Sequence, residues 1–392
     1  MRPAEGGGLW LAVGMAALQA CSSGPKGPVG PAEPSSDAPA TGAAPVPLAT
    51  LAASAAASPE GAEASASFNP RLLRRFAKAR ASIESDANPL TPEKIALGRM
   101  LFFDARLSRD KDISCNSCHS LTSYGSDGAK TSLGEAGQRG TRNSPTVYHA
   151  AGLFAAFWDG RAANVEEQAL LPLLNPKEMA MPDAAAVVER LQAIPGYVQA
   201  FERAFPRETR SLSFENLGRA IGAFERKLVT SSRWDDYVGG NNAALTAAEI
   251  NGLRAFTNLG CMVCHTGEFV GGNSYQRVGA VEPWPNQQDQ GRFDNTRDPA
   301  DRMMFRVPTL RNVAKTAPYF HDGSAATLEQ AVHDMGRHQL GLTLSSLEIS
   351  AIVAWLNSLT GELPLEYIQE PALPPDPRAP GAVAASSPPP RE

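Results

Sequence analysis

The sequence predicts a mainly helical protein with two similar modules in tandem, long loops, and disordered segments at both ends. Three observations predict this fold class. Apolar residues recur at steps of three and four in several segments, as one face of a helix requires. No long stretch alternates apolar and polar residues, so nothing indicates a large sheet. A Cys-x-x-Cys-His pentapeptide is present twice, at 115–119 and at 261–265.

N-capping residues and apolar periodicity predict four helices. Thr91 before Pro92 opens a helix that runs towards 103, because threonine caps a helix and proline suits its first position. An apolar stripe predicts a second helix at 214–228. Capping boxes open two more, at 246–260 and 345–359. Their residues are Thr246 with Glu249 and Ser345 with Glu348.

The two halves resemble each other before each pentapeptide. Gly98 and Phe102 precede the first, and Gly252 and Phe256 precede the second. A tandem duplication of one small helical module explains this pattern. The turn-rich segment 239–242 is the expected boundary between the modules.

The first twenty residues are typical of an export signal. Arg2 is followed by an apolar run at 9–18, which is too short to span a bilayer as a helix. Residues 18–21, Leu-Gln-Ala-Cys, resemble the lipobox of bacterial lipoproteins, which predicts a lipid on Cys21. Ordinary cleavage after Ala20, with Cys21 left unmodified, is the alternative.

Composition predicts disorder at both ends of the chain and argues against nucleic acid as a partner. Residues 21–67 and 371–392 are rich in alanine, proline and serine and cannot bury enough apolar surface to fold, so we expect a disordered linker and tail. The formal net charge of -5 and the absence of a lysine-arginine run argue against nucleic acid. They also leave the lipid anchor as the expected membrane contact.

Each pentapeptide is the attachment signal for a c-type haem. Residues three apart on a helical turn share a face, so both thiols can bond to one porphyrin, and the following histidine ligates the iron. A disulfide or a four-cysteine zinc site fits less well, because each motif has its own histidine and the two are far apart. The sequence therefore predicts two haem c groups, one on Cys115, Cys118 and His119 and one on Cys261, Cys264 and His265.

The sixth iron ligand is expected to differ between the halves. Met335 lies downstream of His265 at the spacing and in the helical setting of an axial methionine, which raises the haem potential. His333 and His338 flank it and are alternative ligands, but we expect them to be solvated instead. The first half has no equivalent methionine, and its loop 120–145 has no histidine. The first haem is therefore the better candidate for small-molecule chemistry.

Longer motifs carry a specific resemblance. They are "RNSPTV" from Arg142, "FWDGRAANVEEQAL" from Phe157, "NPKEM" from Asn175, "RVPTLRNVAKTAPYFHDG" from Arg306 and "MGRHQLG" from Met335. With the two pentapeptides they resemble, from about 88 to 366, the bacterial dihaem cytochrome c peroxidases. These are relatives of the dihaem enzyme that matures tryptophan tryptophylquinone.

The resemblance implies roles for matching residues. Trp158 matches a tryptophan relay between the haems, and Gln168 and Glu178 match the distal glutamine and glutamate. Asn143, Thr316 and Pro318 match the ligands of a calcium ion, and oxygen donors of this kind suit a hard cation. His321 matches the loop between the haems, with a less defined role. The resemblance also implies a homodimer.

Glu135 is a departure from the family pattern. It stands where many members carry a histidine that ligates the resting first haem and leaves on activation. Without that histidine, we expect a first haem that is open at rest. The carboxylate of Glu135 could instead ligate iron weakly or act as an additional acid or base. His149 is the nearest substitute, and we expect it to pack or cap.

These expectations together describe a dihaem peroxidase that reduces hydrogen peroxide. Its electrons would come from a small cytochrome c or cupredoxin, in the periplasm, from a chain anchored to the outer membrane by its lipid. The alternatives are a dihaem oxidase of a protein or organic substrate and a non-catalytic electron-transfer protein. Met335 favours the peroxidase, because the tryptophan-modifying branch has tyrosine there. The expected domains are a signal peptide (1–20), the linker (21–67), a peroxidatic haem domain (68–240), an electron-transfer haem domain (241–370) and the tail (371–392).

Overall fold

The computed structural model describes residues 68–378. The expected signal peptide, Cys21, the linker and residues 379–392 lie outside the described residues. Between 68 and 378 the chain is mainly helical, and its one regular sheet has two short strands. This confirms the predicted helical class. None of the helices in this range is long and apolar enough to cross a membrane.

Within residues 68–378, thirteen α-helices and two strands are joined by long loops that also contain short 3₁₀ turns. A π-helical turn at Met335–Gln339 follows α12. The helices are α1 (Pro70–Leu73), α2 (Pro92–Phe103), α3 (Cys115–Cys118), α4 (Val165–Gln168), α5 (Leu171–Leu174), α6 (Ala184–Gln192), α7 (Pro195–Ala204), α8 (Phe214–Glu225), α9 (Arg233–Val238), α10 (Ala247–Asn258), α11 (Phe293–Thr296), α12 (Leu328–Asp334) and α13 (Ser346–Ser358). The strands are β1 (Tyr275–Arg277) and β2 (Met304–Arg306), which pair antiparallel.

The four predicted helices are confirmed as α2, α8, α10 and α13. The Thr91 side chain accepts from the Lys94 amide at the start of α2, and both predicted capping boxes are formed. Helix α8 ends at Glu225, earlier than the apolar stripe suggested. The chain turns there, and the Leu228 amide donates to the Glu225 carbonyl.

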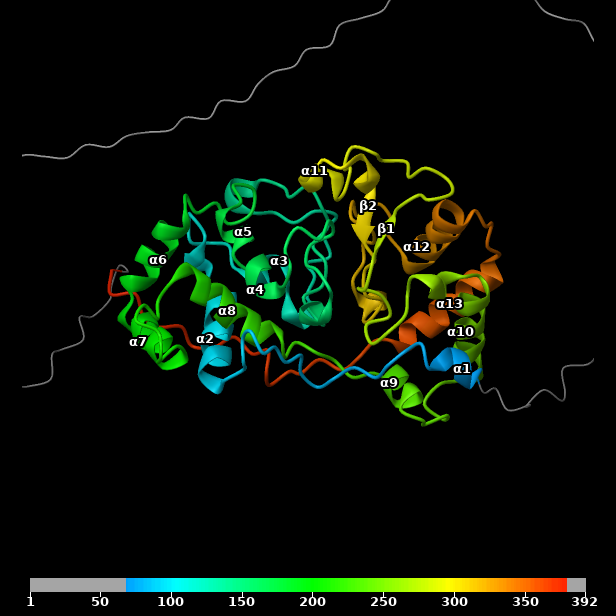
Figure 1. Ribbon diagram of the computed structural model, residues 1–392, viewed down its shortest axis with the longest axis horizontal. Helices are drawn as coiled ribbons and strands as arrows, with labels where there is room; N and C mark the ends of the chain where they lie inside the picture. The colour runs from blue at the N-terminus through cyan, green and yellow to red at the C-terminus, as the bar shows by residue number, and fades with distance from the viewer. Residues whose placement is uncertain (1–67, 379–392) are drawn as a thin grey trace, which may run out of the picture. The chain divides into compact units, whose positions relative to one another are not determined.

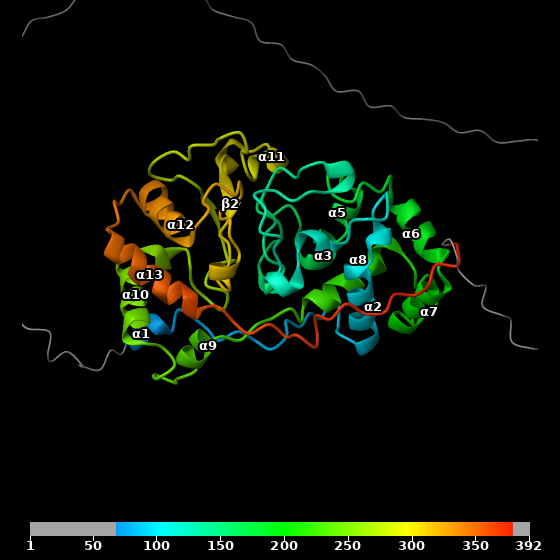
Figure 2. The same ribbon diagram turned by 180° about the vertical axis from the view of Figure 1, so that it is seen from behind.

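Each half is centred on one pair of crossed helices, α2 with α8 and α10 with α13 (Figures 1 and 2). Both crossings depend on a glycine. A Cβ on Gly98 would lie 1.9 Å from the Ala220 carbonyl oxygen, and one on Gly252 would lie 1.9 Å from that of Ala351. The two glycines that suggested a duplication therefore occupy matching positions in the two helix pairs.

The first described residues pack in the core of the second helix pair, and the last ones pack in the core of the first helix pair. Phe68 and Phe76 pack in the core of α10 and α13, where Phe76 meets the ring of Trp234 edge-on at 5.1 Å. Ile368 packs in the core of α2 and α8, and the neighbouring Tyr367 hydroxyl donates to the Phe224 carbonyl at 2.7 Å. Figure 1 shows α1, in blue, beside α10, while the red C-terminal segment runs past α2 towards α7.

A third, smaller cluster comes from the segment of chain between α10 and α13. It consists of Trp284, Met303 and Phe305. Trp158 and Met335, one from each half, pack against it. Because β2 carries Phe305, its pairing with β1 fixes one side of this cluster.

The first part of the expected tail is packed against the protein. Arg106 donates to the Pro374 carbonyl at 2.8 Å, and Pro374 lies over Gly196 on α7, where a side chain would collide. For 371–378 this corrects the expectation of a disordered tail. This proline-rich stretch is ordered because the Pro374 carbonyl accepts a hydrogen bond from Arg106 and the Pro374 ring packs on Gly196.

Candidate functional site

A cavity of about 670 Å³ opens beside the first pentapeptide, a size typical of ligand sites. A capping box between Ser114 and Ser117 starts α3, which is a single turn. That turn places both cysteines on the cavity wall together with His119. Both thiols are free. A single helical turn with two free thiols and an adjacent histidine fits covalent attachment of one haem.

Two histidines are held in the same way, one in each half. His119 Nδ1 lies 3.3 Å from the Gly125 carbonyl oxygen, and His265 Nδ1 lies 3.2 Å from that of Val270. A carbonyl only accepts, so each Nδ1 carries the proton and each Nε2 is left as the metal ligand. Burial lowers the pKa of both rings, that of His265 to about 4. Neutral, oriented imidazoles of this kind fit the proximal ligands of two haems.

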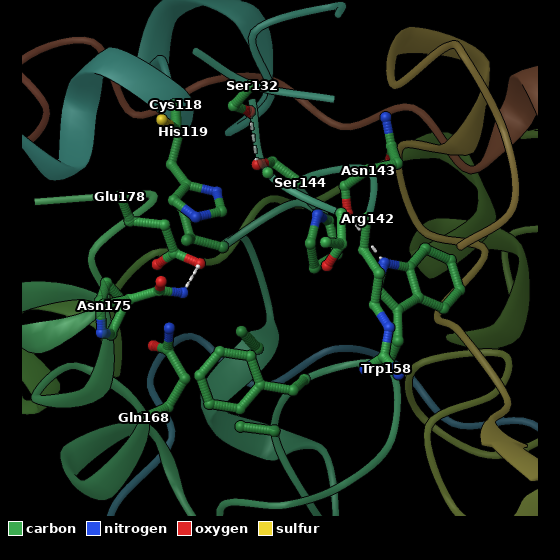
Figure 3. A pocket seen from close by; sticks show the side chains of 18 of the residues that line it. Cys118, His119, Ser132, Arg142, Asn143, Ser144, Trp158, Gln168, Asn175 and Glu178 are labelled. Carbon is green, nitrogen blue, oxygen red and sulfur yellow. Dashed lines mark hydrogen bonds between the residues drawn. The ribbon is translucent and has the colours of Figure 1, made fainter. Parts of the chain in front are cut away.

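Polar side chains gather on one side of the cavity. Figure 3 shows Glu178, Asn175 and Gln168 together on that side, with Trp158 on the other. Gln168 ends α4, and Glu178 lies in the loop after α5. The Asn175 amide donates to the Glu178 carboxylate at 2.8 Å. The structure thus places the predicted glutamine and glutamate in the same cavity as His119.

Glu178 has the electrostatic character of a proton carrier. Burial raises the pKa of its carboxyl, while Arg161 and the hydrogen bond from Asn175 oppose that rise by favouring the carboxylate. A carboxyl whose pKa is moved towards neutrality can both take and return a proton at working pH.

Glu135 lies behind the cavity wall. Its side chain is fully buried, and its Oε1 accepts from the Asp110 amide at 3.1 Å, with the Arg109 guanidinium 3.6 Å away. The neighbouring Gly134 lines the cavity, but Glu135 is not among the described residues that do. Burial and the adjacent Asp110 carboxyl raise the pKa of Glu135. In this conformation Glu135 supports the loop, and its predicted role as ligand or acid stays a prediction.

Trp158 connects the cavity to the other half of the chain. It lines the cavity, and its indole N–H donates to the Asn143 backbone carbonyl at 2.9 Å. Its own carbonyl accepts from the Arg306 amide at 2.7 Å. The ring of His321 lies edge-on to the Trp158 ring, at 6.5 Å, and stacks on Phe305. This position suits the predicted relay between two redox centres.

The predicted calcium ligands lie on two segments, one with Asn143 and one with Thr316 and Pro318, and a backbone hydrogen bond connects these segments. The Asn143 amide N–H donates to the His321 carbonyl at 2.8 Å, and Pro318 and Thr316 lie just upstream of His321. The Asn143 side-chain nitrogen donates to the Ala129 carbonyl, which leaves its amide oxygen as the donor for a cation. Between 68 and 378, no three His, Cys, Asp or Glu side chains group to hold a metal. Calcium there would depend on amide and backbone oxygens.

Comparison with known proteins identifies the family. The family model of the di-haem cytochrome c peroxidases matches residues 92–243. A cytochrome c551 peroxidase of Nitrosomonas europaea is 45% identical over 292 residues, which cover 73% of this chain and 86% of the relative. The chain belongs to the di-haem cytochrome c peroxidase family. This confirms the resemblance carried by the motifs and supports two covalently bound haem c groups.

Two further proteins are also similar to the chain. A methylamine utilization protein MauG of Methylorubrum extorquens is 34% identical over 313 residues, covering 77% of this chain and 88% of that one. The crystal structure of a MauG-like protein associated with microbial copper homeostasis has a TM-score of 0.66 and 31% identity. It covers 75% of this chain and 97% of its own.

The second pentapeptide of this family member lies at the end of α10. Cys261 begins a 3₁₀ turn, and both cysteines are free and partly buried. Met335 begins the π-helical turn after α12 and packs against the third cluster. Such π-turns are frequent at functional sites. Of the histidines beside Met335, His338 bonds the Glu282 carbonyl and His333 bonds Asp334.

Two features of the site were missed from the sequence. Glu225, on α8, lines the cavity with one carboxylate oxygen buried and unpartnered, and burial beside Glu166 raises its pKa to about 8. Helical spacing from Ile221, four residues earlier on the predicted apolar face, could have found it. The indole of Trp284 donates to Asp322 at 3.2 Å. No local pattern joins two residues so far apart in sequence.

His149 is buried against the segment after α8. Its Nε2 lies 3.0 Å from the Thr230 hydroxyl and accepts from the Thr230 amide. Burial lowers its pKa to about 3. It therefore packs as a neutral ring, as the sequence suggested, and is not among the described residues that line the cavity.

Proposed function

We propose that this chain is a dihaem peroxidase that reduces hydrogen peroxide to water with electrons from a small cytochrome c or cupredoxin. One observation carries the proposal. The cavity that holds Cys115, Cys118 and His119 also holds Glu178 and Gln168, and His119 is the one histidine among the described residues that line it. A proximal ligand with a proton carrier, and no second imidazole, is the arrangement that peroxide chemistry needs.

A haem held by Cys115, Cys118 and His119 would supply an iron that binds peroxide and gives an electron to it. The protein residues manage the protons. Glu178 takes the proton from the inner oxygen of peroxide and returns it to the outer oxygen, so that water can leave. Gln168 orients the peroxide or an ordered water through its amide. Asn175 holds the Glu178 carboxylate in position.

The proposed electron route enters at the second haem, held by Cys261, Cys264, His265 and Met335, and passes through Trp158 to the first. The family relatives named for cytochrome c551 support a cytochrome donor. Met335 favours a peroxidase over the protein-oxidising branch. The two tandem haem domains, the calcium ion, the homodimer, the lipid on Cys21 and the periplasmic location remain predictions from sequence.

Steady-state turnover tests the function. The protein with both haems loaded should oxidise a reduced small cytochrome c when peroxide is added. His119→Gly, which keeps both thioether bonds but removes the proximal ligand, should abolish this activity. Absence of turnover in the fully loaded wild-type chain would leave an electron-transfer protein as the better description.

Electron paramagnetic resonance tests the open first site. The oxidised wild-type protein should show a high-spin signal from the first haem, because no second histidine is described on its cavity wall. Glu135→His removes the hydrogen bond to Asp110 and offers an imidazole, so a low-spin form should appear. A wild-type spectrum that is already entirely low-spin would refute the open site.

A further inference from the structure

A second tryptophan lies in the cluster that Trp158 touches. Trp284 is 3% exposed, and Trp158 packs against the cluster that it forms with Met303 and Phe305. Its indole N–H donates to the Asp322 carboxylate at 3.2 Å. Asp322 also lines the cavity of the first haem site. Trp284 is thus a buried indole with a carboxylate partner close to the proposed redox site.

A series of ring contacts joins the two indoles. The Trp284 ring lies 6.3 Å from that of His321, which in turn lies 6.5 Å from that of Trp158. Both separations are within the range of interacting aromatic pairs. Phe305 fills the space beside His321, stacked on it at 4.1 Å. The cavity wall and Trp284 are therefore connected through packed aromatic groups.

The two indoles differ in what accepts their N–H. Trp158 donates to the backbone carbonyl of Asn143, which cannot take up a proton at working pH. Trp284 donates to a carboxylate, which is a base lying in hydrogen-bond contact with the indole N–H. Loss of an electron makes an indole N–H strongly acidic. An indole beside a base is therefore oxidised more readily, and the neutral radical left after proton transfer lives longer. Trp158 is therefore suited to transient electron transfer, whereas Trp284 is suited to hold a persistent radical.

We propose that Trp284, with Asp322 as its proton acceptor, is a radical site that supplies the second electron when the second haem has none to give. The inference rests on the proposed peroxidase function. Cleavage of the O–O bond releases the first water and withdraws two electrons, and the second water forms when the external donor later restores those electrons together with two protons. One of the withdrawn electrons would come from the first haem. The other leaves Trp284 through His321 and Trp158, while the indole proton moves to Asp322 and a neutral tryptophan radical remains.

The test uses the fully oxidised chain with both haems loaded, so that the second haem has no electron to lend. It is mixed with hydrogen peroxide, frozen rapidly and examined by electron paramagnetic resonance, while the haem absorbance is followed in parallel. We expect a tryptophan radical whose hyperfine structure narrows when the protein is grown with ring-deuterated tryptophan. The Trp284→Phe variant should lose this signal yet keep the haem response to peroxide.

Asp322→Asn tests the proton acceptor. Asparagine keeps the oxygen that accepts from the Ser324 amide at 3.1 Å, but it can present an amide donor to the indole N–H in place of the carboxylate. The neutral radical should therefore be lost without loss of the turn. Asp294→Asn is the matched control, because Asp294 lines the same cavity and its change removes the same charge. It should leave the radical unchanged.

Each outcome decides the inference. A haem response to peroxide with an unchanged radical in Trp284→Phe or in Asp322→Asn would overturn the assignment and leave the proposed function standing. Equal loss in Asp294→Asn and Asp322→Asn would also overturn it, because charge alone would then explain the effect. No haem response in the oxidised wild-type chain would overturn the inference together with the open peroxide site.

Discussion

Gly134 lies directly against the segment that carries Glu178. A Cβ at this position would lie 2.2 Å from the Lys177 carbonyl oxygen and 2.8 Å from the Glu178 Cα, and both are backbone atoms. The Glu135 amide donates to the Glu178 carbonyl at 2.8 Å across the same contact. Gly134→Ala must therefore push the two backbones apart.

The size of the effect follows from these distances. Ordinary Cβ contacts begin at 3.4 Å, so the two segments must separate by about 1.2 Å. Misplacing a catalytic group by about 1 Å can cost about a hundredfold in rate, which corresponds to about 2.7 kcal/mol of transition-state stabilisation. We expect a loss of this order in the rate constant for peroxide, because Glu178 is displaced from the cavity.

Stopped-flow absorbance of the haem-loaded protein measures that rate constant, and a thermal melt checks that the variant is folded. Gly140→Ala is the matched control in the same loop. Gly140 also lines the cavity, but the nearest atoms to its added Cβ are at 3.8 and 3.9 Å and its φ is not positive. It should react with peroxide as the wild type does. Equal rates in Gly134→Ala and the wild type would refute the claim that this contact positions Glu178.

Three further predictions concern the same site. Glu178→Gln should lower the rate constant for peroxide by about 10² to 10⁴-fold, because an amide cannot carry the proton; Glu225→Gln changes another acid on the cavity wall and should have little effect, so equal losses would contradict the assignment. Since its pKa is raised, the Glu178 carboxylate is lost as the pH falls through that raised value, and the rate should fall on the acid side. Asn175→Ala removes a donor to the carboxylate, raises its pKa further and should move this acid limb to higher pH by about one unit; an unmoved limb in a pH series of stopped-flow rates would argue against Glu178. Trp158→Phe should slow electron transfer from the second haem to the first, seen by flash photoreduction, while the first haem still reacts with peroxide; unaltered transfer would exclude the relay.

Local signals predicted the parts of the fold that local interactions determine. Thr91, Thr246 and Ser345 each cap a helix through atoms only a few residues away, so their helices could be placed from sequence. The cavity residues Gln168 and Glu178 came from long motifs, and the structure places both on one wall.

Tertiary packing decided what the sequence could not indicate. The direction of the Glu135 side chain depends on the hydrogen bond that its backbone amide donates to the Glu178 carbonyl and on the space left by Gly134. The Trp284 and Asp322 pair joins two residues that α11 and β2 separate in the sequence. Neither leaves a periodic or motif signal, because the partners are distant in sequence and no helix or strand sets their spacing.

The exchanged ends of the chain bear on the order in which the two cores are completed as the chain is synthesised. Phe68 and Phe76 are the first described aromatic residues of the chain, yet their partners in the second core are made last. The core around the first cavity in turn needs Tyr367 and Ile368, which follow almost everything else. A chain that emerges from its N-terminus therefore presents the Cys115 motif while the surrounding core is still incomplete. The core against which Cys115 packs is therefore completed only when the segment that carries Tyr367 and Ile368 has been made.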